Sequence, residues 1–110
     1  MDLVALGALR QAAMDRVLIT YSDLTAIIGG IDRGHGPRLS RIGKACADLG
    51  LPLLSILAVS SRTLRPSTRA AFYKERNVVT NDQIDAETQR CWKHDWNDPE
   101  VENIGGILCR

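Results

Sequence analysis

The sequence predicts a mostly helical α+β protein, with a winged-helix-like core, a short strand or small sheet, and a C-terminal helix. Two observations lead to this class: several segments carry apolar residues at helical spacing, and one short apolar run between turn residues is typical of a buried strand. The chain has 110 residues, of which 45% are hydrophobic and 25% charged. These values are typical of one folded domain and exclude wholesale disorder.

The N-terminal third is expected to contain two helices joined by an extended segment. Residues 3–16 have apolar side chains at helical spacing and consist of good helix formers, so they predict the first helix. Residues 17–21 are mostly β-branched or aromatic, which favours a short extended segment. Ser22 is expected to cap a second helix that runs to Ile28 and stops at the following glycine pair.

The middle of the chain predicts a third helix and the buried strand. A loop over residues 31–36 leads to Pro37, which suits a first helical turn, and the helix is expected over residues 38–49. Residues 53–60 predict a buried strand, and both of its faces should be covered because both alternating sets of side chains are apolar. A basic loop follows, with or without a short helix over residues 68–74.

The last predicted helix covers residues 82–94 and is capped by Thr80 or Asn81. It ends a single domain of residues 1–96, and residues 97–110 are expected to form an acidic tail. The expected core collects the apolar positions of these elements, namely Leu24, Ile27, Leu39, Ile42, Cys46, Leu49, Leu54, Ile56, Ala58 and several of Leu3, Leu6 and Leu9.

Charge is unevenly distributed, although the net charge is only +1. Residues 1–32 sum to −2 (two basic, four acidic), residues 33–76 to +7 (nine basic, two acidic) and residues 77–110 to −4 (three basic, seven acidic). A basic middle between acidic ends is typical of a phosphate-binding surface. It is equally typical of two complementary surfaces that meet inside the fold or between protomers.

The third predicted helix has an apolar face and a separate basic face that carries Arg38, Arg41 and Lys44 with Ser40 beside them. A short helix, a turn and such a second helix favour helix-turn-helix-like binding of double-stranded DNA. Arg62 and Arg65 would then contact the DNA backbone from a wing that follows the strand. A solvated helix face carries the same pattern, so that alternative remains open.

Two segments carry a family resemblance, ITYSDLT at residues 19–25 and LLSILAV at residues 53–59. They resemble the C-terminal domain of alkylguanine DNA alkyltransferases and alkyltransferase-like proteins. Residues 19–24, 51–59 and 94–96 are also similar to segments of small uncharacterised bacterial and phage proteins. The first resemblance implies a winged-helix fold that binds DNA, with Tyr21 beside a backbone phosphate and Ser40 in place of an intercalating arginine.

The same resemblance implies that alkyl transfer is lost. Leu57 stands where the family has its nucleophilic cysteine, and Ala58 and Val59 replace the histidine and arginine that follow it. A leucine side chain cannot accept an alkyl group. We therefore predict a protein without catalytic activity.

No other residue pattern predicts a cofactor or a metal site. Cys91 and His94 are spaced so that both could contact one metal ion, but a second close pair of ligands is missing. The three cysteines are an odd number at wide spacing, which indicates free thiols in a reducing compartment and favours the cytoplasm. No uncharged run approaches the length that spans a bilayer, so no membrane association is expected.

Two functions follow from these observations. The first is non-catalytic binding of double-stranded DNA by Tyr21, Arg38, Ser40, Arg41, Lys44, Arg62 and Arg65. The alternative is a small phage or bacterial protein-binding module that inhibits or adapts a nucleic-acid-processing machine, including one of host defence. Its partner contacts would be Asp98, Glu100 and Glu102, because small acidic surfaces can occupy nucleic-acid-binding grooves. Homo-oligomerisation is compatible with either function.

Overall fold

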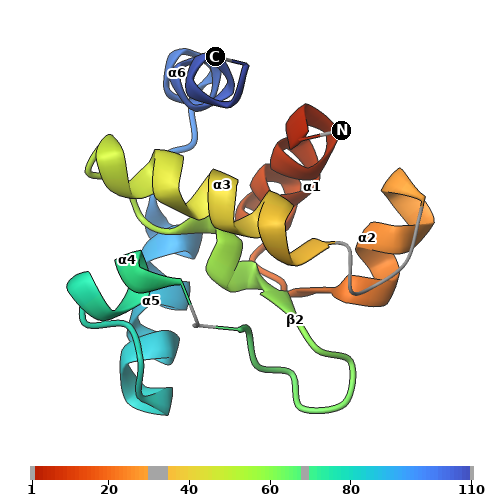
Figure 1. The fold of residues 1–110 in the computed structure, drawn as a ribbon, viewed down its shortest axis with the longest axis vertical. Coiled ribbons are helices and arrows are strands. Elements are labelled where there is room, and N and C mark those ends of the chain that lie inside the picture. Colours follow the sequence, from red (N-terminus) through yellow and green to blue (C-terminus); the bar gives the residue numbers. More distant parts are fainter. Residues whose placement is uncertain (1, 30–34, 68–69, 110) are drawn as a thin grey trace.

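The fold is mostly helical, with one small parallel sheet, which confirms the predicted α+β class (Figure 1). The computed structural model describes residues 2–29, 35–67 and 70–109. In chain order, the elements of this part of the chain are α1 (Asp2–Asp15), β1 (Ile19–Thr20), α2 (Tyr21–Ile28), α3 (His35–Asp48), the 3₁₀ helix η2 (Leu54–Leu57), β2 (Ala58–Val59), α4 (Ala71–Glu75), α5 (Asn81–Lys93) and α6 (Asp98–Leu108). None of the helices described is long and apolar enough to cross a membrane.

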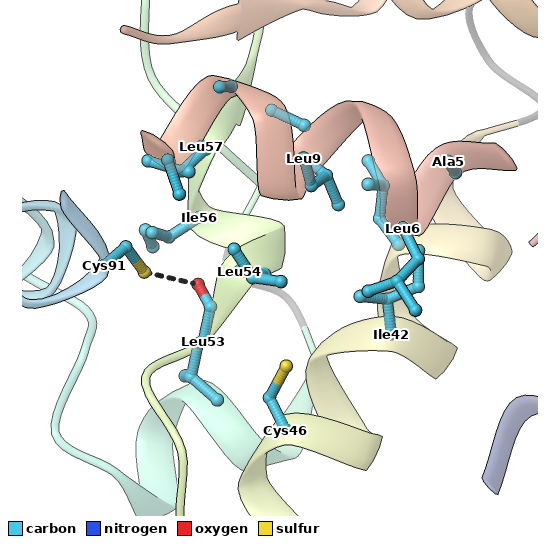
Figure 2. Packing of buried hydrophobic residues seen from close by; sticks show 14 of the residues in the cluster. Ala5, Leu6, Leu9, Ile42, Cys46, Leu53, Leu54, Ile56, Leu57 and Cys91 are labelled. Atoms are coloured by element: carbon cyan, nitrogen blue, oxygen red, sulfur yellow. Dashed lines mark hydrogen bonds between the residues drawn. The ribbon is translucent and has the colours of Figure 1, made fainter. Parts of the chain in front are cut away.

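The core is built around the segment that contains η2 and β2. Every residue from Leu53 to Val59 is buried, and α1, α3 and α5 all pack against η2. Figure 2 shows Leu9 of α1 beside this segment, and Leu6 of α1 facing Ile42 of α3. The prediction that both faces of residues 53–60 are covered is therefore confirmed.

The strand prediction for residues 53–60 is wrong over most of its length. Residues 54–57 form the 3₁₀ helix, and only Ala58 and Val59 pair, in parallel, with Ile19 and Thr20. A short apolar run that is covered on all sides has no periodicity to distinguish a strand from a turn of helix. The sheet is therefore smaller than the sequence suggests.

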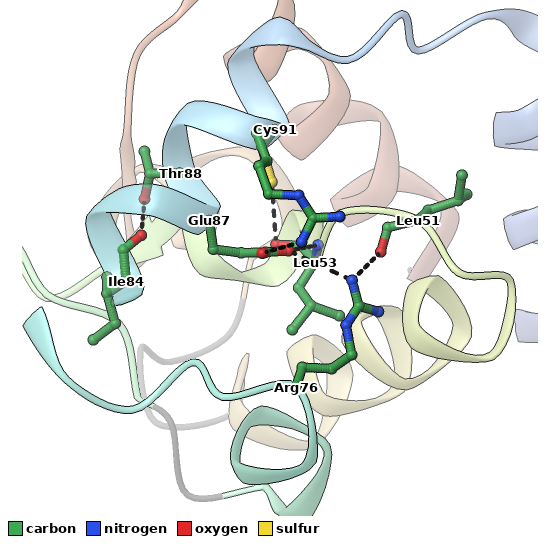
Figure 3. Close-up of polar contacts among 8 residues, drawn as sticks. Leu51, Leu53, Arg76, Ile84, Glu87, Thr88 and Cys91 are labelled. Atoms are coloured by element: carbon green, nitrogen blue, oxygen red, sulfur yellow. Dashed lines mark hydrogen bonds and ion pairs between the residues drawn. The ribbon is translucent and has the colours of Figure 1, made fainter. Parts of the chain in front are cut away.

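A buried acid fixes the backbone at the entrance to η2 (Figure 3). Glu87 of α5 is 3% exposed, and its carboxylate accepts hydrogen bonds from the Leu53 amide at 2.8 Å and from Arg90 at 2.7 Å. Arg76 donates to the Leu51 carbonyl, and the Cys91 thiol donates to the Leu53 carbonyl. These contacts satisfy backbone groups that would otherwise be buried without partners.

The N-terminal caps of α2 and α5 are formed by threonines, and the cap of α2 lies two residues before the predicted position. Thr20, rather than the expected Ser22, caps α2, and its hydroxyl accepts from the Asp23 amide while the Asp23 carboxylate accepts from the Thr20 amide. Thr80 forms the same reciprocal capping box with Gln83 at the start of α5, as one of the two predicted alternatives. Gly29 and Gly50 follow α2 and α3 with positive φ, a conformation that favours glycine.

Residues 97–110 do not form the expected acidic tail. Asn97 caps α6, which packs on α1 and α3 through the fully buried Ile104. The acidic residues of this segment lie near the N-terminus of α6, where the helix dipole favours negative charge. The segment is therefore part of the folded structure.

Other differences concern loops and the edge of the core. The predicted loop over residues 31–36 is replaced at its end by the first turn of α3, and residues 31–34 lie outside the described part of the chain. The short helix that the sequence left open over residues 68–74 is present as α4 over Ala71–Glu75, and residues 68–69 are not described. Two residues assigned to the core, Ile27 and Leu49, are exposed, whereas of Leu3, Leu6 and Leu9, several of which were expected in the core, Leu6 and Leu9 are buried.

Candidate binding surfaces

The basic face of α3 is largely neutralised by acids of the same chain. Arg41 forms a bidentate pair with Asp2 at the start of α1, with nitrogen–oxygen distances of 2.7 and 2.9 Å, and Arg38 lies 3.4 Å from the same carboxylate. Lys44 pairs with Asp48 at 2.9 Å. The hydrogen bond and the positive charge of Arg41 lower the pKa of Asp2, so this acid is charged at neutral pH. Three cations therefore face two anions, and the net charge of this face is +1.

A second helix lies beside this basic face. Ser40, Arg41 and Lys44 line a groove of about 370 Å³ together with Ile107 and Leu108 at the end of α6. Helix-turn-helix proteins present the recognition helix outward so that it can enter the major groove. Here α6 flanks the predicted DNA-contacting side chains.

The predicted wing is not a β-hairpin. Within residues 60–67 the structure has no strand, and the Leu64 amide donates to the Ser60 carbonyl. Arg65 pairs with Asp85 of α5 at 2.7 Å, and Arg62 is exposed. This loop lies at the end of the molecule opposite α6 (Figure 1). The structure therefore does not bring Arg62 and Arg65 to the face of α3 that lies beside α6.

Tyr21 and Ser40 do come together. They line a pocket of about 260 Å³ with Ser55, Ser67 and Tyr73, in which the Tyr21 hydroxyl accepts from the Ser67 amide. The Ser55 and Tyr73 hydroxyls are hydrogen-bonded to each other. Burial raises the pKa of Tyr73, so its hydroxyl stays neutral at physiological pH and cannot act as an anionic base.

Two of the three acids predicted to contact a protein partner help to fasten α6. Asp98 pairs with Arg10 of α1 at 2.7 Å, and Arg10 also donates to the Trp96 carbonyl. Glu100 pairs with His94, which follows α5. Glu102 is exposed at the edge of a groove between α1 and α6.

Two of the three cysteine thiols are protonated at neutral pH. Cys46 and Cys91 are buried, and burial raises the pKa of both thiols, that of Cys46 to about 11, so neither is a thiolate at neutral pH. Cys109 is exposed. Among the described residues no three His, Cys, Asp or Glu side chains are grouped to hold a metal ion.

An apolar groove that the sequence did not predict lies between α1 and α2. We call it the α1–α2 groove, and its volume is about 600 Å³. Four of its large apolar side chains are well exposed, Val4 (44%), Val17 (48%), Leu18 (37%) and Ile27 (53%). The signal was present in residues 17–19, which are all apolar, and in Ile27, which the helical pattern alone assigns to the core.

Comparison of the chain with protein-family models, with curated proteins and with solved structures finds no match.

Proposed function

We propose that this protein is a non-catalytic protein-binding module and that its partner docks in the α1–α2 groove. The observation that carries the proposal is the exposure of four large apolar side chains that line one groove. Isolated exposed apolar residues are common on protein surfaces, whereas contiguous apolar patches are a feature of interaction sites. The free cysteines fit a reducing compartment, and we place the protein in the cytoplasm.

The exposed side chains are large enough to anchor a partner. Full burial of a valine, leucine or isoleucine stabilises by about 1.5–3 kcal/mol, and roughly half of that remains to be gained at each half-exposed position. Protein interfaces depend on a few such anchors surrounded by weaker contacts. The proposal moves the docking surface away from Asp98 and Glu100, because these acids already have partners within the chain.

The test is a comparison of two variants with matched exposure. Ile27→Asp places a charge in the groove, and Val79→Asp does the same at an exposed apolar residue outside it. Affinity capture from a lysate of the source organism, treated with nuclease, is carried out with the wild type and both variants. We expect a stoichiometric protein that the wild type and Val79→Asp retain and Ile27→Asp loses. Equal retention of that partner by all three proteins would reject the groove as the docking site. Circular dichroism verifies that both variants are folded.

DNA binding is the second candidate, and the exposure of α3 favours it. The side chains of Arg41 and Lys44 are 54% and 61% exposed, and Ser40, beside them on α3, is exposed as well. Surface ion pairs contribute only about 0–1 kcal/mol, so phosphates can displace Asp2 and Asp48 from these cations. The resemblance to alkyltransferase domains supports the same function.

The structure limits the strength expected of such binding. With three cations in contact, affinity for duplex DNA should fall about 40-fold between 50 and 200 mM salt, since the logarithmic slope is roughly −0.9 per phosphate. Fluorescence anisotropy with labelled random duplex and single strands measures this. Absence of binding to both at 50 mM salt would remove the DNA candidate and leave the protein-binding proposal untouched.

A further inference from the structure

We infer that the occupant of the α1–α2 groove is an amphipathic helix of the partner that carries basic residues beside its apolar face. This inference rests on the proposed function and specifies the chemistry of the partner. It is based on the charge of the groove, on one acid that is poorly placed for stability, and on the length of the groove.

The charged groups among the described residues that line the groove are all acidic. Asp15 contributes from the end of α1 and Asp23 from the first turn of α2, with the amide of Gln11 nearby. No Lys or Arg lies among these lining residues, although the whole chain has slightly more basic than acidic residues. A basic partner segment would be attracted to this groove, and an acidic one would be repelled.

Asp15 has a position that stability does not explain. It lies in the last turn of α1, where the helix dipole disfavours a carboxylate, and that turn contains no basic residue. Its hydrogen bond from the Gln11 amide, 3.0 Å long and exposed, is an i,i+4 contact that contributes only a few tenths of a kcal/mol. Residues that are locally unfavourable for stability are expected at functional surfaces. Asp23, in contrast, has a structural role in the capping box of α2.

The dimensions of the groove fit a helix. Its lining residues on α1 run from Val4 to Asp15, a length of about 16 Å at a rise of roughly 1.5 Å per residue. That is about three turns of a partner helix, enough for apolar anchors at positions i, i+3 or i+4, and i+7. The small side chains of Ala8, Ala12 and Ala26 lie along the groove and leave room for such anchors.

Two other occupants fit less well. A second copy of this chain, docked symmetrically, would bring two acidic rims into the same interface, and like charges in an interface are unfavourable. An added β-strand would have only the two residues of β1 to pair with, too few for a stable ladder.

The experiment is a selection of displayed helical peptides of about 15 residues, with random charged and apolar positions, on the full chain. Peptides that also bind Ile27→Asp are removed in each round. We expect the enriched peptides to be basic, with apolar residues at helical spacing. Peptides of neutral or acidic charge, or no enrichment over Ile27→Asp, would overturn the inference.

Charge reversal then tests Asp15 directly. We expect Asp15→Lys to weaken binding of an enriched basic peptide about tenfold at 50 mM salt and less at 200 mM, and to strengthen binding of the same peptide with its basic residues changed to Glu. Glu75→Lys is the matched control, because Glu75 is also an exposed acid at the end of a helix but lies outside the groove. An equal effect of the two substitutions, or none from Asp15→Lys, would overturn the inference.

The outcomes separate this inference from the proposed function. If peptides of any charge bind the wild type and not Ile27→Asp, the groove is a docking site and only the basic chemistry is wrong. If Ile27→Asp captures the same cellular partner as the wild type, the proposed function fails as well. Sedimentation that finds a wild-type dimer abolished by Ile27→Asp would assign the groove to a second copy and overturn the inference.

Discussion

The basic face of α3 and the α1–α2 groove are similarly exposed, but they differ in whether the rest of the chain supplies partners for their side chains. On α3 the cations have acidic partners, one of which, Asp2, lies 39 residues away from Arg41 in the sequence. In the groove, the apolar side chains of Val4, Val17, Leu18 and Ile27 are left between 37% and 53% exposed. A local sequence pattern shows which side chains share one face of a segment. The tertiary structure decides which of these side chains are already paired within the chain and which can still contact a partner. The surface with the clearer sequence signal is therefore the less available one.

The largest difference between the two regions should appear in stability. Ile42→Ala removes a fully buried side chain from the inward face of α3, and we expect a loss of about 2–5 kcal/mol in the free energy of unfolding. Ile27→Ala, in the groove, should reduce it by less than about 1 kcal/mol, because half of the side chain is already exposed and alanine is the better helix former. Urea unfolding measures both values. A large loss for Ile27→Ala would mean that this residue belongs to the core and not to a docking surface.

Glycine substitutions test a related contrast, between a closely packed position on α3 and an open one on α1. A Cβ at Gly43 on α3 would lie 2.5 Å from atoms of Phe72 and Ser55, so Gly43→Ala should destabilise by about 1–3 kcal/mol. A Cβ at Gly7 on α1 meets nothing within 4 Å, so Gly7→Ala should stabilise by about 0.5–1 kcal/mol through helix propensity. Thermal unfolding of the two variants provides the check. Effects of the same sign would contradict the difference in packing.

Secondary structure was predictable wherever local signals were strong. The α5 boundary follows from the Thr80 capping box, and the core positions of α3, such as Ile42 and Cys46, follow from helical spacing. The 3₁₀ helix at residues 54–57 was not predictable, because its apolar side chains are buried on every side and show no period. The helix at residues 98–108 was missed because its acids and its glycine pair suggest a tail, although Val101, Ile104 and Leu108 have helical spacing.

The candidate sites were less predictable for a related reason. The sequence places Arg38, Arg41 and Lys44 on one helix, but the ion pairs of Arg38 and Arg41 with Asp2 depend on how α1 packs against α3. The buried Glu87 and its bond to the Leu53 amide likewise join residues 34 positions apart. Long-range contacts of this kind have no local signature in the sequence.

The smallest expected effect on stability is that of removing the ion pair between Asp2 and Arg41, which distinguishes the α3 face from the groove. The pKa of Asp2 is lowered by Arg41, so its contribution to stability is complete above its ordinary pKa of about 4 and is lost as pH falls through the lower value of the folded protein. We therefore expect Asp2→Asn to reduce the free energy of unfolding by less than about 1 kcal/mol at pH 7. At pH 2 the difference between the variant and the wild type should be smaller than at pH 7. A difference of undiminished size at pH 2 would show that the charge of Asp2 is not responsible.

The same variant also tests the α3 face as a DNA site. Asp2→Asn raises the net charge of that face from +1 to +2 and releases Arg41 from its bidentate pair. If phosphates bind there, duplex affinity at 50 mM salt should rise severalfold, and the salt slope should steepen by up to about one unit. Asp82→Asn is the matched control, since it removes an exposed first-turn acid of α5. An increase for Asp82→Asn equal to that for Asp2→Asn would mean that overall charge attracts DNA and that the α3 face has no special role. An increase confined to Asp2→Asn would restore DNA binding as a function of this face, with the intramolecular ion pair acting against it.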